Sequence, residues 1–145
     1  MGHLKTGFVR PVIVHRAIFG SLERFIAILC EHTGGKWDFW ISPRQIQLIP
    51  MGSDAEEFTE EVYNTLLLQG YSVGVDRSGD TFNKKIMNAQ KEGFNYIGVI
   101  GKAEVQEKAI NLRKRDEAKE IGKVSIPELL KLFEGLRPIK SKKRE

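Results

Sequence analysis

Apolar residues change their spacing along the chain, and the changes predict a domain of alternating strands and helices. Short apolar runs at 45–51, 71–76 and 95–101 are typical of strands, and the last is apolar enough to be buried on both faces. Over 53–70 and 81–93, apolar residues recur every three or four positions, which predicts amphipathic helices. This order predicts an α/β fold in which helices flank a parallel or mixed sheet.

Local signals predict where the helices begin and end. Ser53 with Glu56, and Ser125 with Glu128, have the spacing of capping boxes. Gly70 and Gly93 stand where a helix commonly ends on a glycine. The helix faces predicted to be buried comprise Ala55, Phe58, Val62 and Leu66, then Phe82, Ile86 and Ala89, and finally Leu129, Leu132, Phe133 and Leu136.

The first part of the chain follows a different pattern. A β-branched run at 10–15 predicts a strand, and Ser21 is placed to cap a helix whose apolar residues are Leu22, Phe25, Ile26 and Leu29. Glycines and a proline interrupt the pattern at 32–43, which predicts a boundary. We therefore expect a first segment at 1–43 whose apolar helix stripe lacks partners, a domain at 44–137 with about five strands, and a basic tail at 138–145.

Composition narrows the class of protein and its partners. The 145 residues are 41% hydrophobic and 29% charged, as in ordinary globular domains, and no run is long and apolar enough to cross a membrane. Cys30 is the only cysteine, so no internal disulfide forms. The net charge is +4, and the basic excess lies in 108–145, with 12 Lys and Arg against 6 Asp and Glu. This distribution favours a polyanionic partner, although a solvated terminus would also explain the tail.

Two isolated residues near the N-terminus suit different ligands. His15 could bind a metal, but zinc needs three or four protein ligands, and the few histidines with Cys30 show no paired spacing. Arg24 falls in the first turn of the predicted helix, where anions bind, yet it could equally pair with Glu23 or Glu31. From the residues alone, both side chains could be merely structural.

Lys84 and Lys85 form a third candidate. They lie near the start of the helix predicted at 81–93, where cations are unfavourable unless an anion approaches. A solvated helix start is the alternative interpretation. The chain contains neither a phosphate-binding loop nor a dinucleotide-binding glycine pattern.

The fourth candidate is a polar strand face. In 109–115, Ile110 and Leu112 alternate with Asn111, Arg113 and Arg115, which predicts a half-exposed strand with a basic side, and Glu104 precedes it. Carboxylates accept hydrogen bonds from base amino groups, and arginine donates in pairs to guanine or phosphate. Unpaired RNA bases display these edges, so the strand suits RNA, although an ordinary half-exposed strand would show the same alternation.

Four stretches together resemble threonyl-tRNA synthetase of the eukaryote type. They are RPVIVHRAIFGSLERFIAIL, GGKWDFWISPRQ, NKKIMNAQ and NLRKRD, and the similarity covers nearly the whole chain. The resemblance implies that 1–43 is the end of a catalytic core, including motif 3, and that 44–137 is a three-layer anticodon-binding domain.

The resemblance also implies roles for individual residues. His15 matches a ligand of the family's catalytic zinc, and Arg24 matches the motif 3 arginine that contacts ATP. Glu104 and Arg113 match residues that read the threonine anticodon. The further candidates for anticodon binding are Asn111, Arg115, Lys84 and Lys85.

The function implied by the resemblance is anticodon recognition during the ATP-dependent attachment of threonine to tRNA. The complete cytoplasmic enzyme is a homodimer that uses zinc and ATP with magnesium. We expect this chain by itself to hold no cofactor and to be inactive, because most of the catalytic domain is absent from it. The alternatives are a stand-alone module for protein binding or dimerisation, and a small α/β ligand-binding protein.

Overall fold

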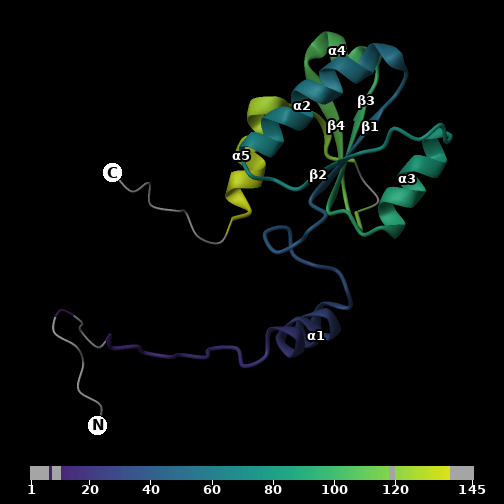
Figure 1. Ribbon diagram of the computed structural model, residues 1–145. Helices are drawn as coiled ribbons and strands as arrows, with labels where there is room; N and C mark the ends of the chain where they lie inside the picture. Colours follow the sequence, from purple (N-terminus) through teal and green to yellow (C-terminus); the bar gives the residue numbers. More distant parts are fainter. Residues whose placement is uncertain (1–6, 8–10, 118–119, 138–145) are drawn as a thin grey trace. The chain divides into compact units, whose positions relative to one another are not determined.

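The computed structural model describes residues 7, 11–117 and 120–137, in two units, Met1–Gly35 and Lys36–Glu145 (Figure 1). The predicted basic tail at 138–145 lies outside the described residues. The structure divides the chain after Gly35, whereas the boundary was expected near residue 43. The segment that follows Gly35 is thus part of the second unit. Its Phe39 is only 7% exposed and packs in that unit's core.

The first unit contains one helix, α1 (Leu22–Thr33), among its described residues. As predicted, the Ser21 side chain caps it, accepting a hydrogen bond from the Arg24 backbone N–H at 3.4 Å. The strand predicted at 10–15 is wrong for its described part, since residues 11–17 are exposed and have no regular structure. A strand needs a neighbour to satisfy its backbone groups, and the described residues of this unit provide none.

The apolar stripe of α1 is largely uncovered, as the sequence predicted. Leu22 is 63% exposed and Ile26 is 45% exposed, and α1 has no buried residue.

A mixed sheet of five strands in the order β2-β1-β3-β4-β5 forms the centre of the second unit. The parallel strands are β1 (Ile46–Pro50), β2 (Val73–Val75) and β3 (Tyr96–Ile100). The antiparallel strands are β4 (Ala109–Lys114) and β5 (Gly122–Ser125). The predicted sheet is thus confirmed, although the short β5 had no apolar run to reveal it.

Helices cover both faces of this sheet and make three layers. On one side lie α2 (Glu56–Leu68), which follows a 3-10 turn, and α5 (Ile126–Gly135), while α3 (Phe82–Lys91) lies on the other (Figure 1). The six-residue α4 (Lys102–Glu107) joins β3 to β4 and was not predicted. No helix in the described ranges is long and apolar enough to span a membrane.

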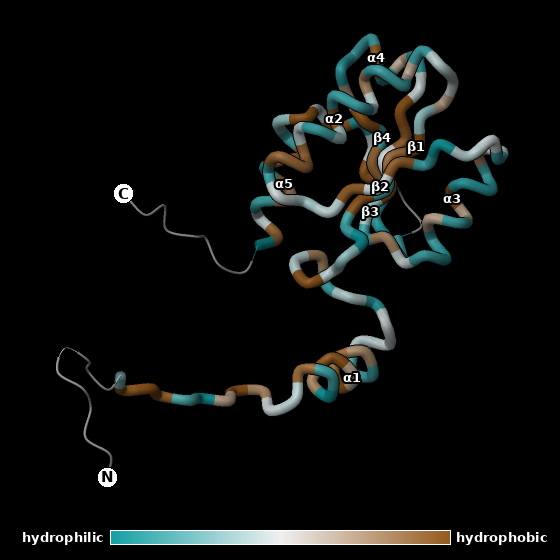
Figure 2. The backbone as a smooth tube through the Cα atoms, in the orientation of Figure 1, coloured by the Kyte–Doolittle hydropathy of each residue, from teal (hydrophilic) through white to brown (hydrophobic). Residues whose placement is uncertain are grey.

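Each face of the sheet has its own core. The larger one, against α2 and α5, includes four aromatic rings that pack on one another, those of Phe39, Tyr71, Tyr96 and Phe133. The smaller one lies against α3 and contains Ile49, Ile86, Ala89, Phe94, Ile97 and Val99. Figure 2 shows hydrophobic residues concentrated along the central strands, which agrees with a sheet buried on both faces.

The predicted helix boundaries are largely confirmed. Gly70 and Gly93 both have positive φ angles and donate back to the preceding helix, as C-terminal glycines do. The Ser125 hydroxyl and backbone N–H both donate to Glu128, so this capping box is present. The box predicted at Ser53 is wrong, because Ser53 is the first residue of a 3-10 turn that starts from Gly52 at φ 91° and makes no cap hydrogen bond.

The face of α5 is narrower than predicted. Leu129 and Phe133 are fully buried, whereas Leu132 and Leu136 are each 37% exposed. All four were predicted to be buried because their spacing of three or four residues puts them on one side of a helix. In the structure, Ile126 and Leu130 complete the packed side of the helix instead.

Replacing Phe133 should therefore destabilise the fold strongly. We expect Phe133→Ala to lower the free energy of unfolding by about 3–5 kcal/mol, because the ring is fully buried among three others. Urea unfolding followed by circular dichroism measures the change. Leu132→Ala is the matched control and should cost less than about 1 kcal/mol. Equal losses would contradict the described orientation of α5.

Candidate nucleic-acid interface

Strand β4 presents its polar residues on the side of the sheet that α3 covers. Arg113 pairs in register with Ile97, which packs in the core under α3, and residues paired across antiparallel strands point to the same face. Asn111, two residues earlier, lies on that face as well, while Ile110 and Leu112 are fully buried on the other. The alternation predicted from the sequence is confirmed.

Glu104 has a structural role at the start of α4. One of its carboxylate oxygens, Oε2, accepts a hydrogen bond from the Gly101 backbone N–H at 3.0 Å and so caps the helix. The other oxygen, Oε1, lies 3.9 Å from the Lys123 ammonium. The Glu104 side chain retains 15% exposure, so it is neither sealed inside nor fully solvated.

Lys123 connects Glu104 to the polar side of β4. It pairs in register with Asn111 across β5 and β4, and its ammonium donates to Glu107 at 2.7 Å. The hydrogen bond with Glu107 raises the pKa of Lys123 above its ordinary value. Glu104, Lys123, Asn111 and Arg113, together with Glu120, form a continuous polar strip.

Glu120 was not recognised in the sequence but contacts both predicted base-reading residues. Its Oε1 pairs with a terminal nitrogen of Arg113, and its Oε2 accepts from the Asn111 side-chain amide at 3.1 Å. Even so, Arg113 Nε and Asn111 Oδ1 are enclosed without a hydrogen-bond partner among the described residues. Glu120 therefore satisfies only part of the hydrogen-bonding capacity of the two side chains.

Arg115 lines the same small pocket as Arg113 and Glu120, but its guanidinium is engaged by backbone carbonyls. Its guanidinium donates to the backbone carbonyls of Gly93 at 3.2 Å and Trp37 at 3.0 Å, and the side chain is only 17% exposed. These bonds tie the segment before β1 to the end of α3. The geometry gives Arg115 a structural role and leaves no free donor fork for a base.

Lys84 and Lys85 meet carboxylates of this chain. Lys84 donates to Asp80 at 2.8 Å on the surface. Lys85 is only 9% exposed, and its ammonium lies 3.2 Å from the Asp76 carbonyl and 3.8 Å from the Asp76 carboxylate. These acids explain why two lysines are tolerated near a helix start, without an external anion.

Asp76 is held as a carboxylate at this position. Burial acts to raise its pKa, but hydrogen bonds from the Ser78 hydroxyl and backbone N–H, with the nearby Lys85 ammonium, outweigh burial and hold the pKa of Asp76 below its ordinary value. The burial of Lys85 could have been noticed in the sequence. It lies three residues after Phe82 and four before Ala89, on the inner face of α3.

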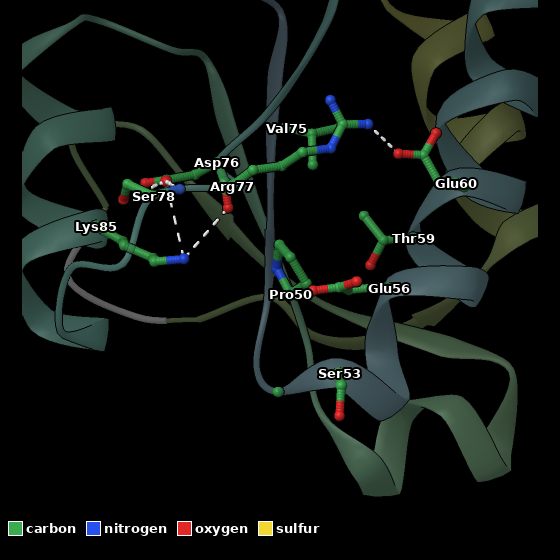
Figure 3. A pocket seen from close by; sticks show the side chains of 11 residues that line it. Pro50, Ser53, Glu56, Thr59, Glu60, Val75, Asp76, Arg77, Ser78 and Lys85 are labelled. Carbon is green, nitrogen blue, oxygen red and sulfur yellow. Dashed lines mark hydrogen bonds and ion pairs between the residues drawn. The ribbon is translucent and has the colours of Figure 1, made fainter.

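A pocket of about 310 Å³ adjoins this pair at the carboxyl ends of β1 and β2 (Figure 3). Figure 3 shows Lys85 pointing toward Asp76 and Ser78 on one side, with Arg77 paired to Glu60 of α2 on the other. Four of the charged side chains that line the pocket are therefore paired, Lys85 with Asp76 and Arg77 with Glu60, while the lining residue Glu56 makes no ion pair among the described residues. This is the position where the small-ligand alternative would place its site.

His15 and Arg24 belong to the first unit and are both exposed. The described residues contain no group of three or more His, Cys, Asp or Glu that could hold a metal ion. A zinc site therefore does not fit the described residues, in which His15 belongs to no such group.

The fold and the strip define a class, namely a three-layer α/β domain with a polar strand beside one helix. The chain belongs to the anticodon-binding domain family, whose model matches residues 45–136.

Individual relatives narrow the family further, to the threonine–tRNA ligases. The chain is 44% identical over 140 residues to the cytoplasmic threonine–tRNA ligase of Saccharomyces cerevisiae and 43% identical over 137 residues to cytoplasmic threonine–tRNA ligase 1 of Homo sapiens. Each alignment covers 94% of this chain but only 19% of the relative. The predicted resemblance to threonyl-tRNA synthetase is thereby confirmed, for a chain that spans about a fifth of its relatives' length.

A solved structure supports the same assignment. The RNA binding domain of threonyl-tRNA synthetase from Cryptosporidium parvum Iowa II superposes with a TM-score of 0.81 at 39% identity, covering 94% of this chain and 34% of that one. The shared architecture includes the sheet that carries the polar strip.

The buried pair beside the pocket should matter for stability. We expect Lys85→Met to lower the free energy of unfolding by about 3 kcal/mol, because the enclosed Asp76 carboxylate would lose its cation. Denaturant unfolding at pH 7 measures the loss. Lys84→Met removes the same charge one residue earlier from an exposed pair and should cost less than about 1 kcal/mol. Similar losses for the two variants would contradict the distinction.

Proposed function

We propose that this chain binds the anticodon loop of a threonine tRNA and is the anticodon-reading part of a cytoplasmic threonine–tRNA ligase. The family match and the names of the relatives support this function over a stand-alone protein-binding module. The observation that carries the proposal is the polar strip, in which Arg113 and Asn111 stand side by side on one face of β4.

The chemistry of the strip suits unpaired bases. An arginine fork donates two parallel hydrogen bonds to guanine, and an asparagine amide both donates and accepts. Arg113 is 34% exposed, so it is fixed by the strand yet reachable from solvent. Glu104 contributes a carboxylate oxygen that accepts from a base amino group, while its other oxygen keeps α4 capped.

The catalytic roles implied by the resemblance belong to the longer ligase. There we propose that Arg24 contacts ATP, which is used with magnesium, and that His15 contributes one zinc ligand beside residues this chain does not supply. We also propose that the longer ligase is a homodimer. The part described here recognises tRNA.

We predict that Arg113→Ala weakens binding to an RNA hairpin with a threonine anticodon by about 1–3 kcal/mol, because a paired donor to a base is lost. Fluorescence anisotropy at fixed salt measures the affinity. A hairpin with an unrelated anticodon should be bound weakly by both proteins.

Lys114→Ala is the matched control for charge. Lys114 neighbours Arg113 but pairs in register with Tyr96 and so points to the opposite face. Lys114→Ala should lower the affinity for both hairpins slightly and by the same factor. If Arg113→Ala also lowered the affinity for both hairpins by the same factor, Arg113 would contact phosphate and would not read a base.

We further predict no threonine-dependent exchange of pyrophosphate into ATP by the 145-residue chain. The reason is that the chain aligns with only 19% of the yeast ligase, and its His15 lies outside any metal-binding cluster among the described residues. An assay with labelled pyrophosphate measures the exchange, with a full-length threonine–tRNA ligase in parallel. Exchange above background that requires threonine would contradict the prediction.

A further inference from the structure

We infer that Glu120 is a specificity-determining residue that occupies the base-reading donors of the polar strip until RNA displaces it. The inference rests on the proposed function, since it assigns Arg113 and Asn111 a nucleic-acid ligand. Glu120 lies just before β5 and reaches across to β4, where one carboxylate contacts both residues.

The carboxylate imitates the ligand that the strip is proposed to bind. It presents two acceptor oxygens, one to the guanidinium of Arg113 and the other to the amide of Asn111. Guanine O6 with N7, or two phosphate oxygens, present the same paired acceptors. An RNA group cannot use these donors while Glu120 holds them, so binding requires an exchange of acceptors.

The contact is weak enough to be exchanged. The side chains of Arg113 and Glu120 are 34% and 41% exposed, and ion pairs this accessible contribute little to stability. Glu120 also leaves Arg113 Nε and Asn111 Oδ1 without partners among the described residues.

The consequence is discrimination between ligands. A group that offers two well-placed acceptors recovers what is lost when Glu120 leaves, whereas a group with one acceptor does not. The displaced carboxylate also stays near the site and repels phosphates that approach without a matching base. Glu120 thus lowers the affinity of the strip for every RNA, and it lowers this affinity most for RNA with an unrelated anticodon.

The test compares Glu120→Gln with Glu117→Gln in the full 145-residue chain. Both changes remove one negative charge between β4 and β5, but Glu117 pairs with Lys114 and, among the described residues, makes no hydrogen bond or ion pair with Arg113 or Asn111. The probes are RNA hairpins with a threonine anticodon or an unrelated one, at fixed salt. Thermal unfolding checks that each variant is folded.

We expect Glu120→Gln to bind both hairpins more tightly, by about two- to fivefold for the threonine anticodon and by a larger factor for the unrelated one. Glu117→Gln should change both affinities less and by the same factor. In an Arg113→Ala/Asn111→Ala background, the gain from Glu120→Gln should fall to that of Glu117→Gln, because the contested donors are gone.

The inference is overturned if the two glutamine variants gain equally, or if the gain survives in the double-alanine background, because either result would reflect general charge alone. It is also overturned if the unchanged chain binds the threonine hairpin specifically and Glu120→Gln has no effect, and the proposed function would then stand. If neither the unchanged chain nor any variant distinguishes the hairpins, the proposed function fails and the inference fails with it.

Discussion

The pairing of β4 with β3 is the constraint on which the rest of the second unit depends. It places Leu112 opposite Gly98 and Arg113 opposite Ile97. A Cβ atom at Gly98 would lie 3.0 Å or less from Ile110 of β4 and Leu48 of β1. Because glycine has no Cβ, these two side chains can pack over β3 in the large core. The register that buries Leu112 in the large core is therefore the one that places Arg113 on the opposite face of the sheet.

Since side chains alternate along a strand, the two roles of β4 cannot be separated. A slip of one residue would expose Ile110 and Leu112 and bury Asn111 and Arg113. The packing of the hydrophobic core thus fixes where the recognition groups stand. The proposed function uses this rigidity, because paired hydrogen bonds to a base require donors that are already in place.

Much of the fold could be predicted from the sequence because the patterns that form its elements are local. The apolar run of β3, the alternation in β4 and the Ser125–Glu128 box each depend on neighbours within a few residues, and the structure has all of them. The failures depend on distant or competing partners. The run at 11–15 has strand-forming residues but no strand beside it among the residues that the structure describes, and Ser53 lies inside a turn that Gly52 starts.

The candidate site was predictable to a similar extent. Alternation was enough to place Asn111 and Arg113 on one polar face, and Glu104 was a candidate from its place just before the strand. The same alternation grouped Arg115 with them, but it could not show that the carbonyls of Gly93 and Trp37 engage the Arg115 guanidinium, because these carbonyls are remote in sequence. Glu120 and Lys123 were missed for the same reason, since only the pairing of β4 with β5 brings them to the strip.

The most direct test of the account is a nuclear magnetic resonance titration of the ¹⁵N-labelled chain with a hairpin that carries a threonine anticodon. The account predicts that the largest shift changes occur at Glu104, Asn111, Arg113 and Glu120. It predicts little change at α1 or along α5. Changes centred on α1 or α5, with the four strip residues unaffected, would contradict it.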